Sequence, residues 1–92
     1  MKDIYSMLAT EIIKQQEDIV GPLAWIEAQR VSGLDVKDQT VNIKKDGKKV
    51  LQALVNQYET LFGQASVEVC RDAVRDYISE IDRNKLPSVL VS

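Results

Sequence analysis

Residues 17–28 read EDIVGPLAWIEA and place Gly21 next to Pro22 inside a segment that is otherwise helical in pattern. A proline inside a helix removes one hydrogen bond and crowds the preceding turn at a cost of about 3 kcal/mol, and a glycine adds about 1 kcal/mol. The same pair also suits the start of a new helix, with Gly21 as its N-cap and Pro22 in its first position. The arrangement of the N-terminal third therefore depends on whether the chain bends or breaks here.

The apolar pattern around the pair favours a bend. Ile12, Ile19 and Ile26 recur every seven residues on both sides of it. At about 100° per residue, such a repeat drifts by only about 20° per heptad, so the apolar face keeps its phase. An unrelated second helix would have no reason to keep that phase. The sequence predicts one bent or tightly jointed helical unit with a continuous apolar face, and a break near Val20 is the alternative.

Two short segments with alternating apolar residues follow this unit. Leu34 and Val36 alternate with polar residues, and so do Val41 and Ile43. A period of two is typical of strands with one face on the core, so we expect a short β-hairpin. Gly33, just before it, suits the left-handed position that ends a helix.

Two longer segments predict an antiparallel helix pair. The first begins after Asp46, a suitable N-cap, and stops at Gly63, whereas the second begins near Ser66 and ends near Asn84. The joint between them is short, which makes the two helices neighbours. Their apolar residues at helical spacing are Val50, Leu51, Leu54, Val55, Tyr58, Leu61 and Phe62, then Val67, Cys70, Ala73, Val74, Tyr77, Ile78 and Ile81.

These elements predict an α+β fold that is mainly α: a bent N-terminal helix, a short β-hairpin, and an antiparallel helix pair packed on the first helix. The length of 92 residues fits one domain. We expect residues 1–86 to form a single helical domain with a small hairpin. Residues 87–92 begin with a proline and end in strand-like composition, so they are expected to form a C-terminal tail or an edge strand.

The composition argues against several classes of protein. The chain has no histidine, a single cysteine and no glycine-rich phosphate loop, so the usual catalytic triads and thiolate metal sites are missing. Cys70 lies on an apolar helical stripe and is expected to be a buried structural thiol. We expect no enzymatic activity, catalytic residue, cofactor or metal. No apolar run approaches about 18 residues, and the first residues do not resemble a signal peptide, so we expect a cytoplasmic protein without membrane contact.

Lysines gather between the predicted hairpin and the following helix. Lys44, Lys45, Lys48 and Lys49 surround a helix N-terminus, where side-chain charge and free N–H groups hold phosphates. Binding of nucleic acid or of a phosphate ligand through these lysines is the alternative function. Lysines beside a turn are also ordinary solubilising residues, and no aromatic residue lies between them for base stacking.

The joint between the two predicted C-terminal helices resembles a DNA-binding helix-turn-helix with Gly63 in the turn. The second helix begins with Glu68 and Asp72, whose carboxylates would be repelled by DNA phosphates. The net charge of −2 adds no general attraction to nucleic acid. Sequence-specific DNA binding is therefore disfavoured.

Trp25 lies beside Ile26 and three residues after Pro22. A tryptophan at the margin of an apolar face either completes the edge of a core or anchors a partner's pocket. Residues 1–31 also carry surplus apolar side chains, Ile13 among them, beyond what a small monomer is expected to cover. We therefore predict a protein-interaction surface at Pro22, Trp25 and Ile26, and a homodimer formed through the first helix.

The segment Val20-Gly21-Pro22-Leu23-Ala24 resembles the hydrophobic-Gly-Pro-hydrophobic-Ala signature of small helical domains appended to some bacterial serine/threonine kinases and other signalling proteins. The chain departs from these domains by its predicted hairpin between the helices and by having no kinase portion. The resemblance implies an accessory, protein-binding role and transfers no catalytic residue. The leading prediction is a non-catalytic protein-interaction or regulatory module, acting by itself or with a signalling partner.

Overall fold

A computed structural model describes residues 4–44 and 46–91 of the chain. In chain order its elements are α1 (Ile4–Val20), α2 (Leu23–Ala28), β1 (Leu34–Lys37), β2 (Thr40–Ile43), α3 (Gly47–Phe62), α4 (Ala65–Ile78), the 3₁₀ turn η1 (Arg83–Lys85) and α5 (Ser88–Val91). The predicted fold class, α+β and mainly α, is confirmed.

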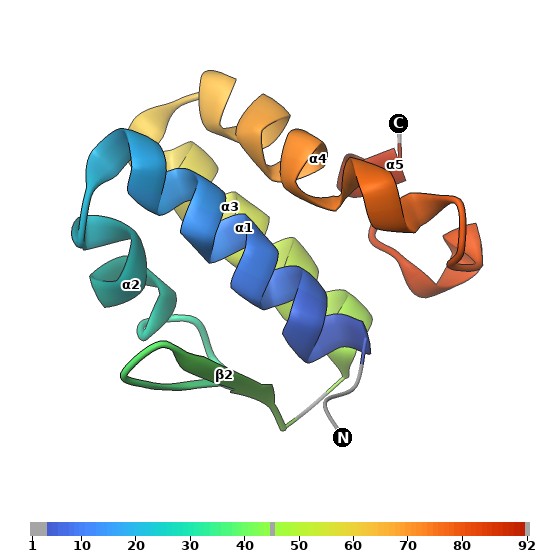
Figure 1. Ribbon diagram of the computed structural model, residues 1–92, viewed down its shortest axis with the longest axis horizontal. Coiled ribbons are helices and arrows are strands. Elements are labelled where there is room, and N and C mark those ends of the chain that lie inside the picture. The colour runs from blue at the N-terminus through green and yellow to red at the C-terminus, as the bar shows by residue number, and fades with distance from the viewer. Residues whose placement is uncertain (1–3, 45, 92) are drawn as a thin grey trace.

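Three long helices form the body of the molecule. α1 and α3 run side by side in the same direction, and α4 runs back against both of them (Figure 1). α3 and α4 are thus the antiparallel pair that the sequence predicts, packed on the first helix. α2 and the hairpin lie on one side of α1, and α5 packs on α4.

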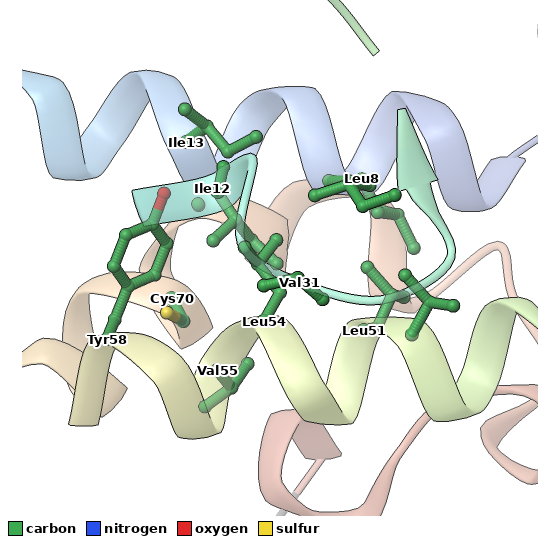
Figure 2. Close-up of a cluster of buried hydrophobic side chains, with 14 of the residues drawn as sticks. Leu8, Ile12, Ile13, Val31, Leu51, Leu54, Val55, Tyr58 and Cys70 are labelled. Carbon is green, nitrogen blue, oxygen red and sulfur yellow. The ribbon is translucent and has the colours of Figure 1, made fainter. Parts of the chain in front are cut away.

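The core fills the space between α1, α3 and α4. In Figure 2, Leu8 and Ile12 of α1 face Leu51 and Leu54 of α3, and all four side chains are fully buried. Full burial of one such side chain contributes about 1.5–3 kcal/mol. The predicted inner face of α3 is confirmed for Val50, Leu51, Leu54, Val55 and Tyr58, and that of α4 for Val67, Cys70, Ala73 and Val74.

Buried polar groups on α1 bond to other elements. The Nε2 of Gln16 donates to the carbonyl oxygen of Ser66 at 2.9 Å and lies 3.4 Å from the Sγ of Cys70. Near the other end, the hydroxyl oxygen of Ser6 accepts the backbone N–H of Ile43 at 3.1 Å. An unpaired buried polar group costs about 1–3 kcal/mol, so these bonds favour one docking of α4 and of the hairpin on α1.

The N-terminal unit bends at the predicted place, but as a joint between two separate helices. α1 ends at Val20, Gly21 adopts a φ of +73°, and Pro22 precedes the first residue of α2 with a helical φ of −58°. A left-handed residue between two right-handed helices changes the direction of the chain, so α2 turns away from the axis of α1 (Figure 1). The alternative of a break near Val20 is the one observed.

The prediction of a continuous apolar face is consequently wrong. Ile12 is fully buried, whereas Ile19 is 64% exposed and Ile26 is 50% exposed. The constant turn of 100° per residue on which the prediction relied does not hold across a left-handed glycine, which takes Ile26 out of phase. Ile19 keeps the phase of Ile12 within α1, so its exposure goes with its place in the last turn of that helix. Ile13, expected among the surplus apolar residues, is fully buried instead.

The predictions for Asp46, Gly33, Gly63 and the hairpin are confirmed. The carboxylate of Asp46 accepts the backbone N–H groups of Lys48 and Lys49 and caps α3. Gly33 and Gly63 adopt left-handed φ angles of +88° and +87°. β1 and β2 pair as an antiparallel hairpin.

The end of the chain differs from expectation. α4 stops at Ile78, earlier than the predicted Asn84, and residues 88–91 form the short helix α5. The edge-strand alternative for the tail is wrong, because α5 packs on α4 whereas the hairpin contacts α1 and α2. Two bonds attach this segment: the Nε of Arg71 donates to the Val89 carbonyl oxygen at 2.8 Å, and the Tyr5 hydroxyl donates to the Lys85 carbonyl oxygen at 2.8 Å.

The conformation of Gly21 leads to a stability prediction. No atom lies within 4 Å of the place a Cβ would take, so Gly21→Ala adds backbone strain without a clash. We expect it to lower the free energy of unfolding by about 1–2 kcal/mol in urea denaturation. Gly21→Asn should cost less, because asparagine tolerates the left-handed region. An alanine variant as stable as the parent would contradict a left-handed joint.

Two buried titratable groups lead to a prediction about alkaline pH. Burial raises the pKa of Cys70 from 9.0 to about 11, and burial also raises the pKa of Tyr58. Between pH 9 and 11 the folded protein keeps the thiol proton that the unfolded chain releases. The contribution of Cys70 to the free energy of unfolding is therefore complete below pH 9 and is lost as the pH rises towards 11. We expect the free energy of unfolding to fall over this range. Cys70→Ala should show a shallower fall, and an unchanged slope in that variant would contradict the assignment.

Candidate interaction surface

Polar contacts with α3 fix the position of α2. The hydroxyl of Tyr58, which is fully buried, donates to the carbonyl oxygen of Ala24 at 2.7 Å. One turn along α2, Oε1 of Glu27 accepts from Nε2 of Gln57 at 2.9 Å and lies 3.6 Å from Nε of Arg30. These contacts decide which side of α2 faces the core.

Trp25 lies on the inner side of α2. Its side chain is only 8% exposed and belongs to the buried core together with Ala24 and Ala28. Its Nε1 is buried and has no hydrogen-bond partner among the described residues. Of the two roles considered for Trp25, edge of the core and anchor for a partner, the free chain places it in the first.

Pro22, Leu23 and Ile26 lie on the outer side of α2. All three are exposed, Leu23 by 40% and Ile26 by 50%. Their spacing of three and four residues puts them on one face of a helical turn. Ile19, in the last turn of α1, is directly before the joint and is the most exposed large apolar residue of the described chain.

Leu61 on α3 belongs to the same region. It follows Gln57 by four residues, and Leu23 precedes Glu27 by four, so each leucine lies one turn from the hydrogen bond that joins the two helices. α2 runs roughly opposite to α3 (Figure 1), so one turn back along α2 and one turn forward along α3 lead in the same direction from that bond. We call Ile19, Pro22, Leu23, Ile26 and Leu61 the elbow surface. It contains every large apolar residue of the described chain that is exposed.

A small hollow next to the elbow surface does not suit a ligand. It lies where α1, α3 and α4 meet, is lined by Ile19, Val20, Phe62 and Val69 among others, and has a volume of about 100 Å³. Pockets for small molecules usually measure about 300–1,000 Å³. An exposed apolar surface with so shallow a hollow suits contact with a protein better than a small molecule.

The four lysines of the predicted phosphate site do not form one group. The Nζ of Lys44 lies 3.5 Å from the Oδ2 of Asp35, so this lysine is paired across the hairpin. Lys45 lies outside the described residues. Lys48 and Lys49 are exposed at the start of α3, where the carboxylate of Asp46 already occupies their backbone N–H groups.

Three of the five residues of the elbow surface are not among the interaction residues that the sequence predicts. Of the predicted interaction residues, Pro22 and Ile26 are exposed and Trp25 is buried. The sequence pattern places Ile19 and Leu61 only on apolar helix faces. The signal that could have identified Ile19 is the Gly21-Pro22 pair two residues later, since it marks the end of α1 and places Ile19 in the last turn.

No protein-family model, curated protein or solved structure matches the chain. The likeness to domains appended to signalling proteins therefore stays a prediction. Across residues 4–44 and 46–91, no helix has the length and apolar character needed to cross a membrane. The same residues contain no group of three metal-ligating side chains.

The Tyr58 bond to α2 leads to a prediction. Tyr58→Phe keeps the ring and removes the donor, so we expect a loss of about 1–2 kcal/mol in the free energy of unfolding. Trp25 is the only tryptophan and lies on the helix that loses the bond, so its fluorescence reports local release of α2. Tyr77→Phe is the matched control, because the Tyr77 hydroxyl makes no hydrogen bond within the described chain. Equal losses in the two variants would contradict a specific role for Tyr58.

Proposed function

We propose that the protein is a non-catalytic interaction module of the cytoplasm, which associates with a second copy of itself through the elbow surface. The observation that carries this proposal is the concentration of exposed large apolar side chains at one end of the bundle. Single exposed apolar residues are ordinary, whereas a group of them marks an interaction site.

The chemistry of the elbow surface supports a second copy as the occupant. A two-fold interface places the same patch of both copies face to face, and an apolar patch is complementary to itself. The exposed acid Asp18 directly precedes the patch in the chain, and the exposed base Arg30 follows it. Antiparallel pairing of two patches brings these opposite charges of the two copies towards each other at the rim, where charge guides orientation.

A stable dimer needs more surface than five side chains provide. A standard interface buries about 800 Å² on each partner, so the polar residues around the elbow surface must take part. The central apolar residues still carry most of the binding energy in interfaces of this kind. We therefore expect Ile19 and Ile26 to decide whether the dimer forms.

Sedimentation equilibrium of the whole chain at micromolar concentration tests this proposal. We expect a dimer for the parent chain and a monomer for Ile19→Glu and Ile26→Glu, because each variant puts a carboxylate into the centre of the apolar contact. Both positions are exposed in the single chain, so the variants should keep the parent's circular dichroism and free energy of unfolding as a monomer.

Gln39→Glu, at the exposed turn of the hairpin, adds the same charge away from the elbow surface and is expected to stay dimeric. A parent chain that is monomeric throughout the range overturns self-association. A dimer that survives both isoleucine variants overturns the elbow surface as the interface.

A further inference from the structure

A second region is built at the other end of α3, between its first turns and the C-terminal segment. A cavity of about 720 Å³ opens there, which is within the usual range for small-molecule sites. Its cationic lining comes from two distant parts of the chain, Lys48 and Lys49 of α3 and Arg83 of η1. The fold thus brings together charges that the sequence separates by more than thirty positions.

These three cations differ from the paired ones elsewhere on the surface. Arg30, Lys44, Arg71 and Arg75 each form an ion pair with a carboxylate. Within the described chain, Lys48, Lys49 and Arg83 form none. Among the described residues of the lining, Asp46 has the only side-chain carboxylate, and it accepts the backbone N–H groups of Lys48 and Lys49. The described part of the lining therefore has three cationic side chains and one anionic one, on a chain whose net charge is −2.

The remaining lining is apolar in part. Leu86 and Pro87 are buried beneath the cavity, and the half-buried Val91 of α5 borders it. A fully hydrated ion such as inorganic phosphate gains no binding energy from these apolar residues. An anion with an organic body places its charge on the cations and its body on the apolar residues.

We propose that this cavity binds a small organic phosphate. Lys48 and Lys49 supply mobile point charges, and the guanidinium of Arg83 supplies paired N–H donors that match phosphate oxygens. The backbone N–H groups of Lys48 and Lys49 take no part, because the carboxylate of Asp46 accepts them. The site lies about 20 Å along α3 from Leu61, so it is separate from the elbow surface and independent of self-association.

Calorimetric titration of the whole chain at low salt tests the site with three probes: adenosine diphosphate, inorganic phosphate and adenosine. We expect adenosine diphosphate to bind at least about tenfold more tightly than either of the others, since it alone has both parts that the cavity receives. Its affinity should fall as salt is added, because the cations are exposed to solvent. Equal affinity for adenosine diphosphate and inorganic phosphate overturns the proposal.

Variants distinguish specific binding in the cavity from a general attraction between the protein's positive charges and the ligand. Lys49→Gln and Arg83→Gln should each weaken adenosine diphosphate about three- to tenfold. Lys37→Gln removes the same charge from an exposed lysine on the hairpin and should leave the affinity unchanged. Equal weakening by Lys37→Gln overturns the site. Val91→Ser should reduce the advantage of adenosine diphosphate over inorganic phosphate, and circular dichroism checks that each variant is folded.

A short DNA duplex as competitor distinguishes the source of the phosphate. We expect adenosine diphosphate to bind the cavity in its presence with little loss of affinity. A duplex that binds more tightly than adenosine diphosphate, and loses that affinity in Arg83→Gln, shows that the cations read a nucleic-acid backbone and overturns the small-molecule ligand.

Discussion

The left-handed conformation of Gly21 is the constraint on which the N-terminal half depends. An L-amino acid with a side chain pays about 1–2 kcal/mol for this conformation, and glycine does not. Because Gly21 adopts it, α1 ends one residue earlier and α2 sets out in a new direction against α3. Had the helix continued, Ile26 would have kept the phase of Ile12 and Ile19. The joint instead leaves Ile26 on the surface and buries Trp25.

Hydrogen bonds between elements fix one orientation of α2 after this joint. Apolar contacts alone specify a helix orientation loosely, since many rotations of α2 would bury Ala24 and Trp25. The bond from Tyr58 to the Ala24 carbonyl has a defined length and direction, and it lies in a region from which water is excluded. Gln16 has the same role between α1 and α4. Losing either bond would leave a polar group buried without a partner, so alternative packings cost more than the native one.

The sequence predicts most of the fold because its local signals agree with one another. Asp46 and Gly63 mark the ends of α3, and the apolar residues between them have helical spacing, so caps and pattern indicate the same element. The elbow surface was only partly predictable, because periodicity records spacing along the chain and not the path of the backbone. Leu61 has the spacing of a core residue, yet its side chain is 47% exposed. Arg83 could not be connected with Lys48 from the sequence, since their proximity depends on how η1 folds back beside α3.

The two ends of α3 present opposite chemistry, and both are costly to the isolated chain. At the C-terminal end, exposed leucine and isoleucine side chains order water without gaining burial. At the N-terminal end, Lys48 and Lys49 oppose the positive end of the helix dipole, each by about 0.3–1 kcal/mol. Neither departure helps the fold, because Asp46 already caps the helix and the core is complete without Leu61 or Ile26. A partner or ligand that binds only the folded chain raises the free energy of unfolding by mass action and so offsets such a cost. Both costs therefore fall where a binding surface is proposed, and neither is offset by a gain in the folding of the isolated chain.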